Sequence, residues 1–198
     1  MGKIFYIMGK SASGKDSIYE LLLGRIKGIR KIIPYTTRPM RSQEQDGVDY
    51  YFVDEAKLEE FEEKGLVIER RDYATVKGNW TYFTVKDETV DACRANYLAV
   101  GTLESYRKMK EYYGQQMVCP VYIEVEDGER LTRAIARERK QPVPQYEEMC
   151  RRFLADQRDF SEEKLAQAGI TRRYVNDRIL RCVEEIEKEI SAEAGACG

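Results

Sequence analysis

The sequence of 198 residues contains no histidine, and its five cysteines include no Cys-x-x-Cys pair. The lack of histidine excludes a Ser-His-Asp triad and removes the commonest zinc ligand and general base. No apolar run reaches the length of about eighteen residues typical of a membrane span, and no secretory signal is evident. Free thiols and the missing signal predict a cytoplasmic protein with no membrane partner.

Acidic and basic residues are nearly balanced, with 33 Lys and Arg against 35 Asp and Glu, a formal charge of −2. This balance argues against nucleic acid as a partner, because nucleic-acid-binding proteins need a basic surface. A content of 42% apolar and 34% charged residues is typical of a globular protein. At this length we expect a single domain over residues 1–191, followed by a disordered tail over 192–198.

Residues 9–15 read Gly-Lys-Ser-Ala-Ser-Gly-Lys and follow the apolar run at 4–8. This spacing fits the P-loop, in which backbone amides form a concavity for phosphate and a helix begins at the lysine. An ordinary strand–turn–helix cap is the simpler alternative. The P-loop interpretation predicts ATP as a ligand of Gly9, Ser11, Ala12, Ser13, Gly14, Lys15, Asp16 and Ser17.

The P-loop pattern has Ser or Thr after the lysine, where the hydroxyl ligates Mg²⁺, but this chain has Asp16 and then Ser17. A carboxylate also ligates Mg²⁺, so Asp16 is the candidate metal ligand. It also adds negative charge beside the phosphates.

Alternating strand and helix patterns predict a parallel sheet with helices on both faces, the three-layer α/β/α arrangement of P-loop NTPases. Expected strands lie at 4–8, 30–35, 97–101, 118–125 and 173–175, and expected helices at 15–24, 55–64, 87–94, 103–113 and 177–191. Residues 40–86 differ, because β-rich runs at 48–53 and 66–85 predict an antiparallel insert. Residues 128–166 are helical and basic, with a break at Pro142 and Pro144.

A second basic segment, Thr-Thr-Arg-Pro-Met-Arg at 36–41, follows the expected strand at 30–35. Two arginines three apart, Arg38 and Arg41, are suited to clamp a phosphate, and Tyr50 on the next β-rich run can complete the clamp. A solvated basic turn followed by a β-hairpin explains the same residues equally well.

Taken together, the P-loop, Thr-Thr-Arg-Pro-x-Arg and the Asp-Gly-Val-Asp-Tyr-x-Phe-Val of residues 46–53 resemble the guanylate kinase family. The resemblance spans roughly residues 3 to 190. It implies ATP-dependent phosphoryl transfer to GMP, with ATP and Mg²⁺ bound. It divides the chain into a core over 1–38, 87–128 and 167–191, an acceptor-binding insert over 39–86 and a helical lid over 129–166.

The resemblance also implies roles for individual residues. Arg38, Arg41 and Tyr50 would bind the GMP phosphate, and Glu69 would pair with guanine. The stretch at 79–84 would add a phosphate-binding tyrosine and a hydroxyl that reads guanine. Lid arginines would close on the transferring group, although a solvated helix face paired with Glu138, Glu147 and Glu148 is the alternative. The further residues implied are Tyr82, Thr84, Arg137, Arg139, Arg152 and, near adenine, Asn176.

The chain departs from the family pattern at several positions besides Asp16. Pro34 stands where the family often has a serine that touches guanine, and Asp72 is an alternative to Glu69 because the segment between Glu69 and Tyr82 is long. The family's Asp-x-Asp at the end of the central strand is missing, and Thr102 or Glu104 are the nearest substitutes.

Two other functions fit parts of the sequence. Gly-Lys-Asp-Ser after the P-loop also resembles ribose 1,5-bisphosphate phosphokinases, and guanylate-kinase-like scaffold modules keep a similar acceptor site without catalysis. Such modules usually lack the P-loop lysine, which is present here as Lys15. We therefore expect a kinase whose substrates are small nucleotides. We expect it to be a monomer or a homodimer.

Overall fold

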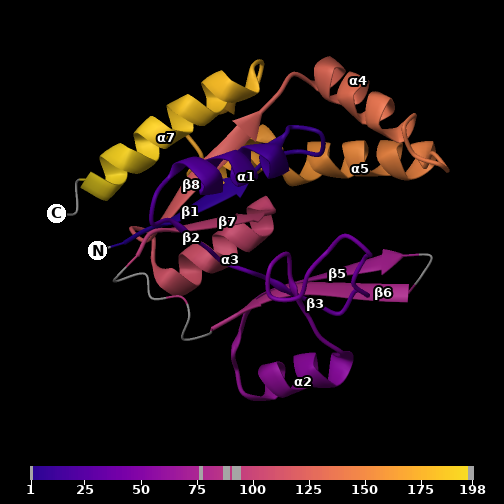
Figure 1. Cartoon of the computed structure of the whole chain (residues 1–198), viewed down its shortest axis with the longest axis vertical. Coiled ribbons are helices and arrows are strands. Elements are labelled where there is room, and N and C mark those ends of the chain that lie inside the picture. Colours follow the sequence, from indigo (N-terminus) through magenta and orange to yellow (C-terminus); the bar gives the residue numbers. More distant parts are fainter. Residues whose placement is uncertain (1, 76–77, 87–89, 91–94, 196–198) are drawn as a thin grey trace.

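A parallel sheet forms the centre of the molecule in the computed structural model, which describes residues 2–75, 78–86, 90 and 95–195. Its strands lie in the order β2-β7-β1-β8-β9, and every neighbouring pair is parallel. Figure 1 shows these strands between helices that lie above and below them. The strands are β1 (Ile4–Met8), β2 (Arg30–Lys31), β7 (Tyr97–Gly101), β8 (Val118–Glu124) and β9 (Tyr174–Val175).

Strand β1 is buried on both faces, which explains its continuous apolar sequence. Side chains alternate along a strand, so Phe5 and Ile7 enter one core and Ile4, Tyr6 and Met8 enter the other. The first core lies under α1 (Lys15–Arg25) and α7 (Ile179–Gly195), and the second under α3 (Leu103–Tyr113) and α6 (Glu162–Gln167). The expected three-layer arrangement is thus present.

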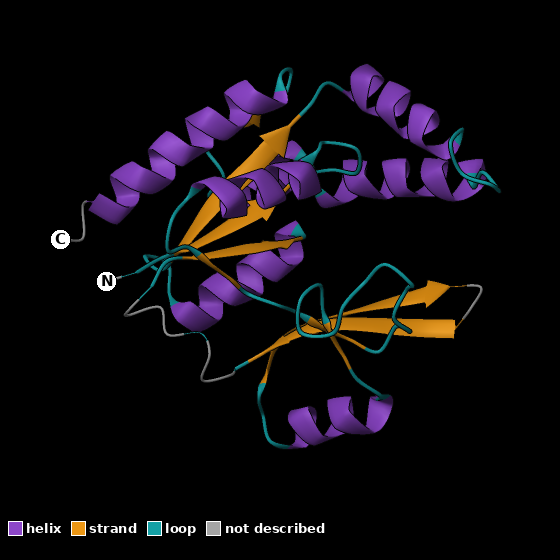
Figure 2. Ribbon diagram, viewed as in Figure 1, coloured by secondary structure: helices purple, strands orange, loops and turns teal. Residues whose placement is uncertain are grey.

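The insert forms a second sheet with its own small core. Its strand order is β4-β3-β6-β5, with β3 antiparallel to β6 and β6 antiparallel to β5. Helix α2 (Glu55–Glu63) covers this sheet through Leu58, which packs with Phe83 and Val85. Figure 2 shows this unit below the parallel sheet. The strands are β3 (Tyr35–Thr36), β4 (Tyr51–Phe52), β5 (Val67–Thr75) and β6 (Gly78–Val85).

Three expectations about the insert need correction. The single strand expected at 30–35 is two strands in two sheets, because the chain leaves the parallel sheet after Lys31 and β3 begins after Pro34, which has no N–H to donate to a ladder. The insert sheet therefore starts before residue 39. Strand β4 is shorter than 48–53 and runs parallel to β3. The helix expected at 87–94 falls largely outside the described residues.

Helices α4 (Asp127–Glu138) and α5 (Tyr146–Asp159) pack against each other at one end of the molecule (Figure 1). The break between them contains Pro142 and Pro144, as expected from the missing N–H groups of proline. Helix α6 lies within the range 129–166 expected for a lid, but its Leu165 is buried in the core beneath the parallel sheet.

The predicted disordered tail over 192–198 is wrong for residues 192–195, which continue α7. Glu193 on this last turn forms an ion pair with Lys3 at the start of the chain. Two termini that meet in this way hold the helix end in place, a contact that composition alone does not reveal.

Gly101 ends β7 beside the ring of Tyr6 on the neighbouring strand β1. A Cβ at position 101 would overlap the Tyr6 hydroxyl and lie 3.1 Å from Cζ of the ring. Tyr6 is only 3% exposed, so it has little room to move. The phenol therefore occupies the space that a side chain at position 101 would need.

We expect Gly101→Ala to lower the free energy of unfolding by about 1–3 kcal/mol, because the methyl group overpacks this site. Urea denaturation measures the change. The matched control is Gly24→Ala in α1, where an added Cβ meets nothing within 4 Å and helix propensity improves. In a Tyr6→Phe background the cost at position 101 should shrink; an equal cost in both backgrounds would show that the hydroxyl is not the obstacle.

Candidate active site

The loop at residues 9–14 joins β1 to α1 and turns its backbone sharply. Ala12 has φ 63° and Gly14 has φ 85°, both left-handed, and such alternation turns successive N–H groups into one concavity. Ala12 is a non-glycine residue in this region, a strained conformation typical of functional loops. Helix α1 begins at Lys15 with no side-chain cap, so its first N–H groups remain open to an anion.

Close packing fixes this loop from behind. A Cβ on Gly9 would lie 2.7 Å from the carbonyl oxygen of Ile123, and one on Gly14 would lie 2.5 Å from Nδ2 of Asn176. Asn176 Nδ2 donates to the Ser13 carbonyl at 2.8 Å, and the Asn176 side chain is buried. Asn176 therefore supports the loop in this structure, a role different from the adenine contact expected for it.

The Ser13 hydroxyl is buried, and among the described residues it has no hydrogen-bond partner. Buried polar groups are nearly always hydrogen-bonded, so an unpartnered hydroxyl inside this loop fits a ligand that supplies oxygen atoms. Phosphate is such a ligand. The loop therefore has both the shape and the unsatisfied donor expected of a phosphate site.

Lys15 and Asp16 lie at the mouth of the loop. Lys15 Nζ is 3.6 Å from Asp16 Oδ2, and the Asp16 side chain is 81% exposed. Among the described residues no three Asp, Glu, Cys or His side chains gather to hold a metal. Mg²⁺ bound with a nucleotide needs only one or two carboxylates besides the phosphates, so the single carboxylate of Asp16 fits such an ion.

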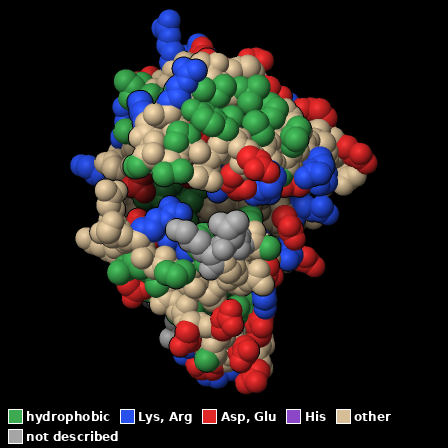
Figure 3. Space-filling view, turned by 90° about the vertical axis from the view of Figure 1, so that its right-hand side faces the viewer, with side chains coloured by type: hydrophobic (Ala, Val, Ile, Leu, Met, Phe, Trp, Pro, Cys, Tyr) green, Lys and Arg blue, Asp and Glu red, His purple; other side chains and the backbone are tan. Residues whose placement is uncertain are grey.

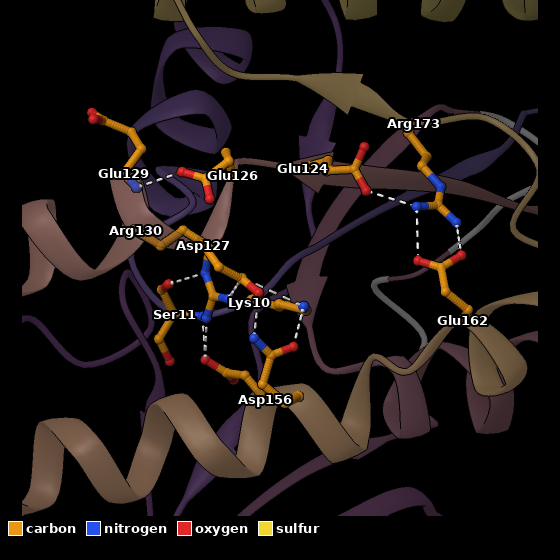
Figure 4. A network of polar contacts seen from close by, with 11 residues as sticks. Lys10, Ser11, Glu124, Glu126, Asp127, Glu129, Arg130, Asp156, Glu162 and Arg173 are labelled. Atoms are coloured by element: carbon orange, nitrogen blue, oxygen red, sulfur yellow. Dashed lines mark hydrogen bonds and ion pairs between the residues drawn. The ribbon is translucent and has the colours of Figure 1, made fainter.

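Arg130 of α4 joins the loop to the two helices at its side (Figure 4). Its side chain is 1% exposed and donates to the Ser11 carbonyl at 3.0 Å and to Asp156 Oδ2 at 3.0 Å. The same Asp156 oxygen accepts the Ser11 N–H at 2.7 Å. Asp127 is a further partner of Arg130, and Phe153 lies under the guanidinium at 4.9 Å. The loop is therefore clamped between α4 and α5.

Two of the three predicted lid arginines lie beside the Arg130 network. Arg137 and Arg152 line a narrow crevice together with Ser11 and Arg130. Arg152 also forms an exposed ion pair with Glu148, as the solvated-face alternative predicts. Arg139 ends α4 as its exposed C-cap and does not line the crevice. The structure therefore brings Arg137 and Arg152 toward the loop and leaves Arg139 apart from them.

The predicted phosphate clamp centres on Arg38, which is 4% exposed. Its Nε donates to Tyr82 Oη at 3.0 Å, and its other nitrogens bind Glu44 at 2.8 and 3.0 Å. The guanidinium lies 5.6 Å from the ring centre of Tyr50, whose ring also packs edge-on against Tyr82. Arg38, Tyr50 and Tyr82 are thus brought together, while the Arg41 side chain is exposed at the edge.

The two residues predicted to contact guanine, Glu69 and Thr84, are hydrogen-bonded to each other. Glu69 on β5 is buried and accepts hydrogen bonds from Thr84 at 2.8 Å and Ser105 at 2.9 Å. Arg71 adds a two-point ion pair to the same carboxylate. The alternative residue, Asp72, pairs with Arg70 and is largely exposed. Glu69 is therefore the carboxylate in the buried position.

Neither of the proposed substitutes for the missing Asp-x-Asp brings a carboxylate into this cluster. The Thr102 hydroxyl contacts it only through the Ser105 hydroxyl, at 3.0 Å. Thr102 caps α3 by accepting the Ser105 N–H, and Glu104 is exposed and pairs with Lys108. The Tyr6 hydroxyl lies near instead. Burial first, and then the charge of Glu69, raise the pKa of Tyr6, so its phenol stays neutral.

The loop and the phosphate clamp face each other across a hollow. Burial and the neighbouring Tyr82 raise the pKa of Tyr50, and the Asp16 carboxylate adds to the rise, so Tyr50 lies within electrostatic range of the start of α1. Figure 3 shows the surface hollowed between the upper body and the insert, with basic side chains at the hollow. The loop belongs to the upper body of the molecule, and Arg38, Tyr50 and Tyr82 belong to the insert below it (Figure 1).

Comparison with known proteins identifies the family. A family model described as guanylate kinase matches residues 1–162. The guanylate kinase of Symbiobacterium thermophilum is 34% identical over 197 residues, which cover 97% of this chain and 86% of the relative. That of Chlorobaculum tepidum is 26% identical over 193 residues, which cover 96% and 92%. This chain belongs to the guanylate kinase family.

A solved structure agrees with the fold. The crystal structure of guanylate kinase from Anaplasma phagocytophilum matches with a TM-score of 0.65 at 24% identity, over 97% of this chain and 86% of that one. The resemblance to guanylate kinases and the α/β fold predicted from the sequence are thus confirmed. None of the helices in the described part of the chain is both long and apolar enough to cross a bilayer.

Several residues around the site of this guanylate kinase family member were not predicted. Glu44, Arg71, Arg130 and Asp156 all hold other site residues through charged hydrogen bonds. The alternation of a strand could have suggested that Glu69 and Arg71 share a face. The contacts of Arg130 and Asp156 join residues 26 positions apart, and no local pattern reports them.

We expect Glu44→Gln to lower the free energy of unfolding by about 2 kcal/mol near neutral pH, because it weakens the charged fork on buried Arg38. Arg38, helped by the Arg41 backbone amide, holds the pKa of Glu44 below its usual 4.5. The stabilisation is therefore complete above pH 4.5 and is lost as the pH falls through the lowered pKa. Chemical denaturation at several pH values measures it, with exposed Glu63→Gln as the control. A difference between Glu44→Gln and the wild type that stays constant down to acid pH would contradict this account.

We expect Arg130→Met to cost about 3 kcal/mol of stability, because it leaves Asp156 and the Ser11 carbonyl without their buried partner. The control is Arg133→Met on the same helix, whose side chain is 30% exposed and pairs with Glu129; it should cost less than about 1 kcal/mol. Thermal and urea unfolding of both variants test this. Equal losses would mean that the buried network contributes no more than a surface pair.

Proposed function

We propose that this protein transfers the γ-phosphoryl group of ATP to GMP and forms ADP and GDP. The observation that carries the proposal is the opposition of two anion-binding groups, the 9–15 loop and the Arg38 clamp, with Tyr50 in electrostatic range of Asp16. Membership of the guanylate kinase family supports the same reaction.

On the donor side, we assign the triphosphate of ATP to the loop. Its left-handed backbone at Ala12 and Gly14 directs amides into the concavity, and the buried Ser13 hydroxyl gains a partner there. Lys15 lies at the exit of the loop, where an ammonium group neutralises phosphate charge. Mg²⁺ held by Asp16 and the phosphates would neutralise part of the same charge as it moves in the reaction.

On the acceptor side, we assign the phosphate of GMP to Arg38, Tyr50, Tyr82 and Arg41. Glu44 and Tyr82 orient Arg38 before any ligand arrives, so little ordering remains to be done on binding. A nucleotide phosphate is already an anion at neutral pH. Attack on ATP therefore needs no strong base, which agrees with a site that contains no histidine.

Arg137 and Arg152 are assigned to the transferring group. Both line the crevice beside Ser11. An arginine that meets the transition-state charge is worth on the order of 10³-fold in rate or more. Closure of α4 and α5 toward the insert would also keep water from the phosphoryl group.

We also infer that the protein acts in the cytoplasm, as a monomer or homodimer. Cys150 and Cys182 are free thiols, the state expected in a reducing compartment. Its partners are then small nucleotides, as in the guanylate kinase family, and the near-neutral charge argues against nucleic acid.

We expect Lys15→Ala to abolish phosphoryl transfer while leaving the fold intact, since the side chain is partly exposed and its loss removes charge at the phosphates. A coupled ADP-release assay with GMP, dGMP, AMP, UMP and ribose 1,5-bisphosphate measures activity and selectivity. Lys27→Ala, an exposed change outside the loop, is the control.

ADP release with GMP in the wild type and its absence in Lys15→Ala would support the proposal. Release only with the sugar phosphate would replace GMP as the acceptor. ATP binding measured by calorimetry provides the remaining distinction, because a non-catalytic module would neither bind ATP nor release ADP.

A further inference from the structure

The hydrogen-bonding capacity of the Glu69 carboxylate is already used by protein groups. Oε1 accepts from Arg71 Nη2 at 3.1 Å and from Thr84 Oγ1 at 2.8 Å. Oε2 accepts from Arg71 Nε at 3.0 Å and from Ser105 Oγ at 2.9 Å. A carboxylate offers about four acceptor positions, and this side chain is 1% exposed. No acceptor position remains for a base unless one of these donors leaves.

Arg71 presents the same pattern of donors as guanine. Its Nε and Nη2 are joined through one carbon in a planar group and donate side by side to the two oxygens. The N1–H and N2–H groups of guanine are also joined through one carbon in a plane. The two groups therefore fit the same face of one carboxylate and compete for it.

The sequence of β5 explains why Arg71 reaches this position. Residues two apart on a strand share a face, so Glu69 and Arg71 point the same way. Arg70 points to the other face, where it pairs with Glu62 and Asp72. The Arg71 side chain is 15% exposed. Burial lowers its pKa, but Glu69, Tyr6 and Tyr73 together raise that pKa overall, so Arg71 stays ionised at the pair.

We propose that Arg71 is a built-in competitor of guanine, which GMP must displace from Glu69 before its base can be read. This inference rests on the proposed assignment of GMP to this site. Arg71 is then a residue that sets acceptor affinity and base selectivity. Thr84 and Ser105 remain on the carboxylate when Arg71 leaves, and they orient it for the incoming base.

The test compares GMP binding to the full-length wild type, Arg71→Ala and the matched control Arg70→Ala by calorimetry. We expect Arg71→Ala to bind GMP roughly tenfold more tightly or better, because a charge-assisted two-point competitor is removed. Arg70→Ala should bind GMP as the wild type does, and the KM for ATP should stay unchanged in both.

Base selectivity is the second readout, and a purely structural role for Arg71 would not change it. Inosine monophosphate has N1–H but lacks the 2-amino group. Once Glu69 is free to meet both guanine donors, the preference for GMP over inosine monophosphate should rise in Arg71→Ala. Arg71→Lys keeps the charge but loses the planar fork, so it should shift both readouts in the same direction by less.

Unchanged or weaker GMP binding in a folded Arg71→Ala variant would overturn the inference. If Arg71→Ala does not fold, Arg71→Lys decides by the same criterion. Tighter GMP binding without phosphoryl transfer in any variant would overturn the kinase proposal and leave the inference standing. Transfer to GMP with equal affinity in all variants would overturn the inference alone.

Discussion

Buried arginines need acceptors for their N–H groups, and this requirement shapes each part of the site. Arg38, Arg71 and Arg130 are at most 15% exposed in their side chains, and each binds a carboxylate. An unpaired charge in such a place would cost several kcal/mol, so the partners are obligatory. The planar guanidinium also fixes direction, because its donors lie in one rigid fork. The three pairs therefore orient Arg38 in the predicted phosphate clamp, the Glu69 carboxylate on β5 and the loop at residues 9–14, respectively.

The three pairs differ in what they leave open to a substrate. Arg38 donates to Glu44 from Nη2 and to the Tyr82 hydroxyl from Nε. These bonds orient the guanidinium beside the Tyr50 ring. Arg130 is buried and binds the Ser11 carbonyl, Asp127 and Asp156, so it holds the loop between α4 and α5. The Glu69–Arg71 pair is different, because this carboxylate is the group to which we assign the guanine of GMP. Under that assignment, binding requires an exchange of partners, and affinity is the difference between two similar interactions.

Local sequence signals predicted much of this architecture. Strands β1 and β7 and helix α3 begin and end where the apolar patterns predicted, because continuous apolar runs and a Thr102 cap mark them in the sequence. The loop backbone follows only in part from its glycines, because left-handed Ala12 is not a glycine. The sequence predicted one strand at 30–35 where the structure has β2 and β3. A strand of two residues is too short for its sequence pattern to show which sheet it joins. Helix α7 extends to Gly195, beyond the predicted end at residue 191. An ion pair between Glu193 and Lys3, which is distant in sequence, holds its last turn.

The candidate site was predicted less completely, for a related reason. Arg38, Tyr50 and Tyr82 form one group, and Glu69 and Thr84 form another. A family motif identifies residues that contact a ligand, but it does not identify the residues that position those side chains. Arg71, Arg130 and Asp156 act through partners brought close only by folding. Asn176 shows the converse, because a residue assigned to a nucleotide supports the loop from behind.

The end of β7 offers no carboxylate to the Glu69 cluster, and the packing there explains why. Gly101 cannot be replaced by an acidic residue while the Tyr6 ring fills its space, and Thr102 is committed to capping α3. Glu104 faces solvent and pairs with Lys108. Arg71 pairs with Glu69, and under our proposed assignment this pair limits what the Glu69 carboxylate binds.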